Sequence, residues 1–349
     1  MESFFVLATW LDVMAISACA GVLACAIWVI PRHAPGYFHA RLWAGLGIAL
    51  ALLTVASGVL LASRTLEFSG AAFSALPTYL PLVVHKTHFG LIWQTRMVAV
   101  AILWVCWLVG FVRGWRGAAA WLAMVVLLVV VFSRSATGHA GDQGIYSIGV
   151  WVDCVHVLSS GIWVGGLFAM SLLVFPALMR QVDVERMLSV EVFARLSSVA
   201  TIALIAIVVS GVYNAWGGLE RVDDLWQSRY GQVLSFKVIL VAWMVYLGGH
   251  NRYHKLPALR RWVGLPVGRS SFWARVPGWQ PLSTAPGGAH LLSRCARAVH
   301  IESVLGVLVL AAASVLHHGM PPADMRHMGF APAPAVAVVV PFVRQGSQA

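Results

Sequence analysis

The stretch WVDCVHVLSSGIWVGG, residues 151–166, is almost entirely apolar, yet it carries an aspartate and a histidine three residues apart. It lies in an apolar segment long enough to cross about 30 Å of hydrocarbon as a helix. Helical spacing places six side chains on one stripe of that helix: Asp153, His156, Ser160, Trp163, Leu167 and Met170. An ionised carboxylate facing lipid is costly, so we expect the stripe to face the interior of a helix bundle.

The same segment carries two glycines four positions apart, Gly161 and Gly165. Small residues at this spacing allow the backbones of two membrane helices to approach closely. We therefore expect another helix to pack tightly on this side of the segment.

The whole chain has the composition of an integral membrane protein. Its 349 residues are 60% hydrophobic and only 11% charged, with a mean hydropathy of +0.81, whereas soluble domains carry about a quarter charged residues. The net charge of +11 comes from basic residues between the apolar segments. That placement indicates membrane orientation and contact with anionic lipid, so we expect no nucleic-acid partner. The five scattered cysteines form no CxxC and predict neither a disulfide framework nor a zinc site.

The apolar runs predict an all-α membrane bundle of eight transmembrane helices. The expected spans are 5–30, 40–62, 90–112, 118–136, 148–175, 194–216, 233–250 and 298–318. Pro31, Pro176 and the Gly-Met-Pro-Pro stretch at 319–322 are expected to end helices. The first run lacks a basic leader, which favours a first span over a signal peptide. We expect a membrane domain over 1–318 and a tail containing Met and His over 319–349.

The distribution of Lys and Arg predicts the orientation of the spans. One set of connecting segments holds fourteen of these residues, eight of them in 251–297, and the opposite set with the tail holds seven. Positively charged segments stay on the cytoplasmic side. We therefore expect 251–297, which contains no Asp or Glu, to be a loosely structured cytoplasmic loop, and both termini to lie outside, in the periplasm.

With this orientation, candidate metal ligands gather at the outer side. They are His88, His139, His156, His317, His318 and Met320, with His327, Met325 and Met328 further along the tail. Imidazole and thioether together form a ligand set suited to copper. The alternative for the tail is a segment that contains these residues incidentally.

Asp153 needs a partner inside the membrane, and two cations in or near the spans are available, Arg96 and Lys237. Polar residues at the outer ends of neighbouring spans include Asn214 and Tyr230. Asp153, His156 and Met170 could bind an ion and pass it inward along the stripe, or Asp153 and His156 could only hold helices together by hydrogen bonds.

At the inner side, the expected spans place His250 and Asn251 at the end of one helix, and His300 and Glu302 at the start of the next. These residues could form an exit site. The alternatives are that the histidines only form hydrogen bonds at the membrane interface and that Glu302 forms an ion pair with Arg297.

Several stretches in order resemble the CopD family of bacterial inner-membrane copper-resistance proteins. They are THFGLIWQTR (87–96), GHAGD followed by DCVHVLSSGIWVGGL (138–167), RLSSVATIALIAIVVSGVYNA (195–215), RYGQVLSFKVILVAWMVYLGGHNR (229–252) and VHIESVLGVLVLAAASVL (299–316). The resemblance covers essentially all eight expected spans. It does not extend to the Met/His residues at 317–328.

The resemblance implies a multi-pass protein of the bacterial inner membrane that carries copper from periplasm to cytoplasm and contributes to copper resistance. It also implies a separate periplasmic copper carrier of the CopC type as partner, in addition to the lipid bilayer. Carried over to this chain, it favours His139, Asp153 and His156 as metal-handling residues, followed by His88 and Glu302.

Two other functions remain open from the residues. Intramembrane histidines also hold haem, which would make the chain a b-type cytochrome or an oxidoreductase of a haem pathway. A copper-handing assembly factor is the second alternative. The chain contains no nucleotide-binding loop, no CPx motif and no nucleophile with a partnered base, so we do not expect an enzyme or an ATP-driven pump.

Overall fold

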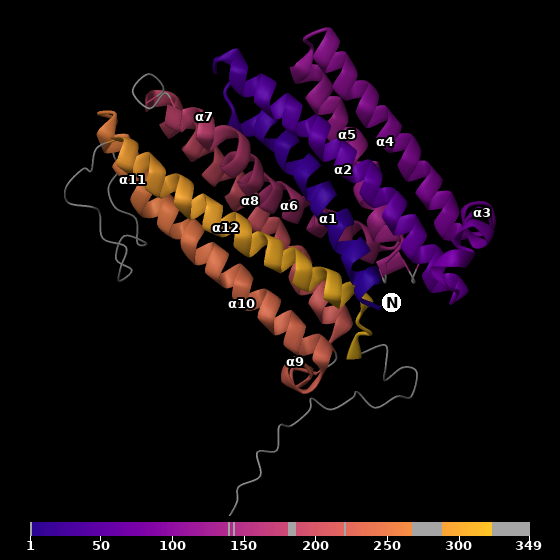
Figure 1. Ribbon diagram of the computed structural model, residues 1–349. Coiled ribbons are helices and arrows are strands. Elements are labelled where there is room, and N and C mark those ends of the chain that lie inside the picture. The colour runs from indigo at the N-terminus through magenta and orange to yellow at the C-terminus, as the bar shows by residue number, and fades with distance from the viewer. Residues whose placement is uncertain are drawn as a thin grey trace, which may run out of the picture.

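The computed structural model is a bundle of long helices, shown in Figure 1, and it describes residues 2–138, 140–141, 144–180, 186–219, 221–266 and 288–322. Within these residues, eight helical segments are long and apolar enough to cross a membrane. They are α1 with η1 (Glu2–Ala24, Cys25–Val29), α2 (Gly36–Ser69), α4 (His88–Val112), α5 (Arg116–Ala136), α6 with η4 and α7 (Ile148–Ala169, Met170–Val174, Phe175–Arg180), α8 (Arg186–Gly218), α10 with η5 and α11 (Arg229–His250, Asn251–Lys255, Leu256–Trp262) and α12 (Gly288–His318). The predicted eight-span all-α bundle is confirmed.

Three short helices complete the described fold: η2 (Phe73–Ala75), α3 (Leu76–Lys86) and α9 (Asp224–Gln227). Helices α3 and α9 lie at the end of the bundle that also holds the N-terminus and the end of α12 (Figure 1). We call this end the N-terminal face. The opposite end, which carries α7 and α11, is the basic face.

Most spans are longer than the sequence predicts. Helix α2 has 34 residues and is therefore about 51 Å long, well beyond the roughly 30 Å of a hydrocarbon core. The extra turns carry polar residues, such as Arg64 and Glu67 in α2, which a hydropathy pattern assigns to loops. The helices continue into the interfacial region because their own backbone hydrogen bonds do not depend on side-chain polarity.

The prediction that Pro176 ends a helix is wrong, because the helix continues to Arg180. A π-helical turn, η4, lies directly before α7 and changes the positions of the carbonyl groups that precede the proline. The predictions for Pro31 and for 319–322 are confirmed, since η1 ends at Val29 and α12 ends at His318.

The predicted loop at 251–297 is also wrong at both of its ends. The helix that begins at Arg229 continues through η5 and α11 to Trp262, and α12 already begins at Gly288. The basic residues that suggested a loop lie on helical extensions. Arg252, for example, donates from Nη1 to the Ser197 carbonyl at 3.1 Å and to Thr201 Oγ1 at 3.1 Å, which fixes the extension to α8. Residues 267–287 lie outside the described residues.

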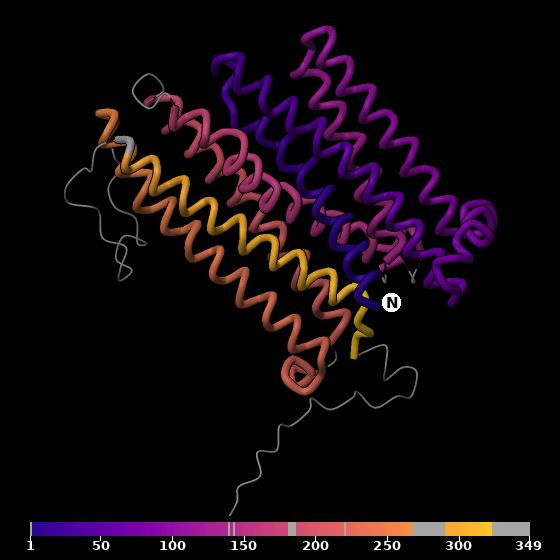
Figure 2. The backbone as a smooth tube through the Cα atoms, viewed as in Figure 1, coloured from indigo at the N-terminus to yellow at the C-terminus, as the bar shows by residue number. Residues whose placement is uncertain are grey.

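Helix α1 lies at the centre of the bundle, between α2 and α6 (Figure 2). It crosses α6 with backbone against backbone. A Cβ atom added to Gly165 would lie 1.7 Å from the Ser17 carbonyl oxygen, and one added to Gly21 would lie 1.8 Å from the Gly165 carbonyl carbon. Gly161 also faces α1, 3.2 Å from Ala20 Cβ by the same measure. The predicted close approach at Gly161 and Gly165 is confirmed.

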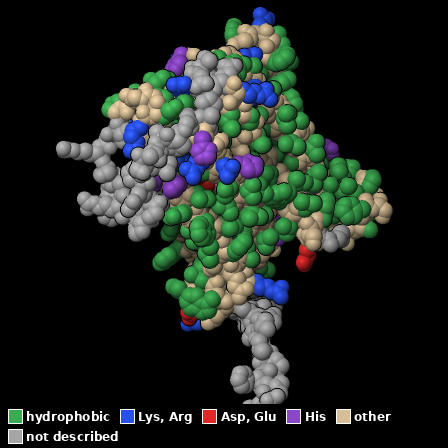
Figure 3. All heavy atoms as spheres, turned by 60° about the vertical axis from the view of Figure 1, so that its left-hand side comes forward, with side chains coloured by type: hydrophobic (Ala, Val, Ile, Leu, Met, Phe, Trp, Pro, Cys, Tyr) green, Lys and Arg blue, Asp and Glu red, His purple; other side chains and the backbone are tan. Residues whose placement is uncertain are grey.

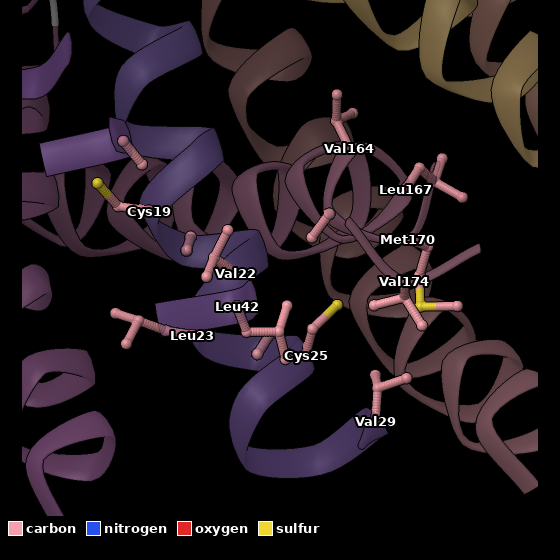
Figure 4. Close-up of a cluster of buried hydrophobic side chains, with 14 of the residues drawn as sticks. Cys19, Val22, Leu23, Cys25, Val29, Leu42, Val164, Leu167, Met170 and Val174 are labelled. Carbon is pink, nitrogen blue, oxygen red and sulfur yellow. The ribbon is translucent and has the colours of Figure 1, made fainter. Parts of the chain in front are cut away.

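Around this central pair, α4 and α5 pack together on one side, while α10 and α12 pack together on the other (Figure 2). All five cysteines are buried and free, as the sequence predicts. Cys25 lies in an apolar cluster with Leu42, Val164 and Met170, as Figure 4 shows. The flank of the molecule in Figure 3 is largely hydrophobic, as expected of a surface that faces lipid.

We expect Gly165→Ala to destabilise the protein, because the new methyl group would collide with the α1 backbone, which has little freedom to move. Overpacking of this kind costs about 1–3 kcal/mol or more. Thermal unfolding of the purified protein in detergent should show a lower midpoint.

Gly166→Ala is the matched control, since a Cβ atom at Gly166 meets nothing within 4 Å. A Gly165→Ala protein as stable as the Gly166→Ala protein would contradict the backbone contact between α1 and α6.

Candidate functional site

Asp153 and His156 lie in the first three turns of α6 and face α8. Asn214 Nδ2 donates to Asp153 Oδ1 at 3.3 Å, and His156 Nδ1 lies 3.0 Å from Ser210 Oγ. Ser210 and Asn214 are one helical turn apart, so a single face of α8 contacts both α6 side chains. Between them, Gly211 leaves room for the imidazole ring, because a Cβ atom there would lie 3.2 Å from His156 Cε1.

The hydrogen bonds of Ser210 determine which nitrogen of His156 carries a proton. The Ser210 hydroxyl donates to the Ala206 carbonyl at 2.6 Å, so its oxygen is left to accept a hydrogen bond from His156. The ring therefore donates from Nδ1, and the lone pair of a neutral His156 is on Nε2. A histidine held through Nδ1 is oriented to bind a metal ion through Nε2.

Arg134 of α5 interacts electrostatically with Asp153, and a second cation at this site is Lys237 of α10. It interacts electrostatically with both Asp153 and His156, and its side chain is half-buried. Of the two cations proposed as partners for Asp153, Lys237 is thus near it, whereas Arg96 is paired elsewhere. Asp153 and His156 of α6 lie 84 and 81 residues before Lys237 of α10 in the sequence.

Arg96 forms a buried ion pair with Asp12 of α1, a residue that the sequence analysis did not single out. Two nitrogens of the guanidinium bind the carboxylate, one of them Nη1 at 3.3 Å from Oδ2, and Nε donates to Ser57 Oγ at 3.1 Å. Asp12 is 0% exposed and Arg96 only 2%. The sequence could have indicated this role, because Asp12 is a lone aspartate in the first apolar run and would be as costly in lipid as Asp153.

This ion pair extends to the end of α12 at the N-terminal face. Arg134 Nε lies 3.8 Å from Asp12 Oδ2. Arg134 Nη1 and Arg64 Nη2 each donate to His317 Nε2 at 3.2 Å, so the proton of His317 is on Nδ1 and its lone pair is already engaged. His318 Nε2 pairs with Thr9 Oγ1 at 2.8 Å. The two histidines therefore tie α12 to α1, α2 and α5.

A cavity of about 530 Å³ opens beside His318 at the N-terminal face. Its walls come from α1, α2, α10 and α12, and its polar lining residues are Glu2, Glu67, Arg229, Tyr230 and His318. Tyr230 and Val233 of its lining lie one to two helical turns from Lys237 on α10. The lining of the cavity thus ends one helical turn before Lys237 on α10, and it includes no described residue of α6 or α8.

Toward the basic face, Glu302 of α12 is buried at 3% exposure and accepts a hydrogen bond from Asn251 Nδ2. Both residues lie in mid-helix, so the prediction that they begin and end spans is wrong. Lys255 interacts electrostatically with Glu302, which takes the place of the ion pair expected with Arg297. His300 is exposed on another face of α12 and pairs through Nδ1 with Ser171 Oγ at 2.8 Å.

The other candidates lie apart from these groups. Met170 and Trp163 are buried in the apolar core, where Figure 4 shows Met170 beside Leu167 and Val174. His88 is exposed at the first residue of α4, and Met320 is exposed just after α12. His139 lies outside the described residues, as do Met325, His327 and Met328. In the part of the chain that the structure describes, no three His, Cys, Asp or Glu side chains converge.

Two family models together match most of the chain. Residues 1–150 match the model described as copper resistance protein D-like, N-terminal domain, and residues 190–316 match copper resistance protein D. Copper resistance protein D of Pseudomonas syringae pv. tomato is 34% identical over 225 residues, which are 61% of this chain and 68% of that protein.

Copper transport protein CutJ of Bacillus subtilis (strain 168) is 30% identical over 182 residues, which are 51% of this chain. The matched region spans only 32% of the length of that relative. No solved structure matches the chain significantly.

We expect Asp12→Asn to destabilise the protein strongly, because Arg96 and Arg134 would be left buried without a counter-charge. Removing one partner of a buried pair costs roughly 3–5 kcal/mol. Thermal unfolding in detergent measures the effect. Glu67→Gln is the control, since it breaks the exposed Arg64–Glu67 pair, which is worth about 1 kcal/mol or less. Equal effects of the two substitutions would refute a structural role for the Asp12 network.

Proposed function

The chain belongs to the copper resistance protein D family, and from this premise we propose that it transports copper ions from the periplasm to the cytoplasm. It is a multi-pass protein of the bacterial inner membrane. The proposed activity moves copper as cargo and involves no catalysed reaction. In the cell it would contribute to copper homeostasis and resistance.

The proposed direction depends on the orientation of the bundle. Twice as many Lys and Arg residues belong to the segments expected at the basic face as to those at the opposite side, so the positive-inside rule places the basic face in the cytoplasm. The N-terminal face, with its cavity, then opens to the periplasm. There a separate carrier of the CopC type would deliver copper, and His88, His139 and Met320 are the proposed residues of first capture. His317 and His318 would join them only after release from the arginines and Thr9 that now hold them.

The observation that carries the proposal is that His156 and Asp153 lie one helical turn apart on α6 and both face α8 inside the bundle. His156 has its Nε2 lone pair available, and imidazole is a good ligand for copper in either oxidation state. Asp153 supplies a negative charge that offsets the cost of bringing a cation into the bundle. Lys237 would neutralise Asp153 when copper is absent, since an unpaired buried carboxylate is unstable.

Glu302 marks the proposed exit toward the cytoplasm. It is a buried carboxylate nearer the basic face, with Asn251 and Lys255 around it. His300 lies on the adjoining face of α12 and would contribute only if the helix rotated, because it now pairs with Ser171.

The geometry gives less support to haem binding. Bis-histidine ligation requires a second imidazole opposite His156 at the same depth. Among the described residues, those found around His156 are Ser210, Gly211 and Lys237.

We expect His156→Ala to reduce copper uptake by a factor of roughly ten to a hundred, because the variant loses its proposed nitrogen ligand. Uptake is measured as copper accumulation in vesicles that contain only the purified protein. Ser210→Ala should give a smaller loss, because it releases the ring without removing the ligand.

His290→Ala is the control for a general loss of histidine, since this side chain is exposed near the start of α12 and has no part in the proposed transport. If His156→Ala vesicles accumulated copper like the wild type, Asp153 and His156 would be only structural.

A further inference from the structure

Helix α10 and its continuation η5 carry a heptad series that spans the membrane: Tyr230, Lys237, Met244 and, at the first residue of η5, Asn251. Seven residues make almost two turns of an α-helix, so successive members lie about 10 Å apart along nearly the same face. Tyr230 lines the cavity at the N-terminal face, Lys237 accompanies Asp153 and His156, and Asn251 binds Glu302. Met244 therefore lies midway between the two polar sites.

Met244 points into the bundle, in contrast to its neighbours on α10. It is 0% exposed, whereas Trp243 is 57% and Val245 39% exposed. The buried residues of α10 are Gly231, Leu240 and Met244, and the helix packs mainly against α12. The thioether is thus on the inner side of α10, on the line that joins Lys237 to Asn251.

The end of this series nearer the basic face contains a hydrogen-bond acceptor without a donor among the described residues. Asn251 is 6% exposed and uses its Nδ2 for Glu302, while its Oδ1 has no hydrogen-bond partner among the described residues. A buried amide oxygen without a donor is costly. Next to a buried carboxylate, such an oxygen is positioned to bind a cation, which both groups would stabilise.

We propose that Met244 binds copper(I) in the middle of the membrane, between the Asp153–His156 site and an inner cation site formed by Asn251 Oδ1 and Glu302. This inference rests on the proposed transport function and names the oxidation state of the cargo. A thioether is a soft, uncharged ligand that favours copper(I), and burying it without a metal carries no charge penalty. Its three rotatable bonds allow the sulfur to swing along the path.

The competing explanation is that Met244 only fills space in the apolar core, and Met244→Leu separates the two. Leucine conserves the volume but removes the sulfur. We expect vesicles with this variant to take up copper(I) roughly tenfold more slowly or worse. Met170→Leu is the matched control, because Met170 is also 0% exposed in the same apolar cluster but lies in η4, away from the heptad series of α10, and its uptake should match the wild type. Wild-type uptake by Met244→Leu would overturn the proposal, and so would equal losses in both variants.

A binding measurement keeps the proposal testable apart from transport. X-ray absorption of the purified full chain loaded with copper(I) in detergent should show sulfur scattering that decreases in Met244→Leu and persists in Met170→Leu. An unchanged spectrum for Met244→Leu would overturn the site. If the sulfur signal depends on Met244 but wild-type vesicles accumulate no copper, the transport function fails and the Met244 site stands.

Glu302→Gln tests the inner site. It should slow copper uptake while it leaves the Met244-dependent sulfur signal in place, because it removes only the charge beside Asn251. Uptake at the wild-type rate would overturn the assignment of Asn251 and Glu302.

Discussion

The contact between α1 and α6 at Gly21 and Gly165 is the constraint on which the rest of the bundle depends. Two helix backbones in direct contact leave no room for side chains between them, so the crossing point is fixed at Gly21 and Gly165. Above this crossing, toward the N-terminal face, α1 presents Asp12 to α4 and α5, while α6 presents Asp153 and His156 to α8. This one contact thus positions both charged groups in the half of the bundle nearer the N-terminal face.

The two intramembrane aspartates meet the same electrostatic cost in different ways. Asp12 is fully enclosed, with a bidentate guanidinium from Arg96 and a second arginine nearby, so its charge is compensated permanently. Asp153 is half-buried and has one amide hydrogen bond at 3.3 Å, while Lys237 and Arg134 interact with it electrostatically but form no ion pair with it among the described residues. The first arrangement is typical of a structural pair, and the second leaves a carboxylate that can exchange its partner for another cation.

The sequence was most informative where a residue's role follows from its own helix. Gly161 and Gly165, the eight spans and the common face of Asp153 and His156 all follow from spacing along one segment. It was least informative about partners. Nothing in the chain indicates that Arg96 belongs to Asp12, 84 residues away, or that Asn251 meets Glu302 in mid-helix. The helix ends predicted at Pro176 and at the start of the basic segment were also wrong, because the π-turns η4 and η5 continue the helices through Pro176 and past His250.

By itself, the amino-acid sequence determined that this chain enters a membrane, how many times it crosses, and which side chains are too costly to face lipid, because those properties depend on local hydropathy and helical periodicity. Only the tertiary structure decided which of those side chains neutralise each other and which remain available. That choice depends on how α8, α10 and α12 pack around α6, and such packing is set by side-chain shape across helices far apart in the chain. For this reason Met244, an ordinary apolar residue in sequence, acquires its place between two polar sites only in the folded bundle.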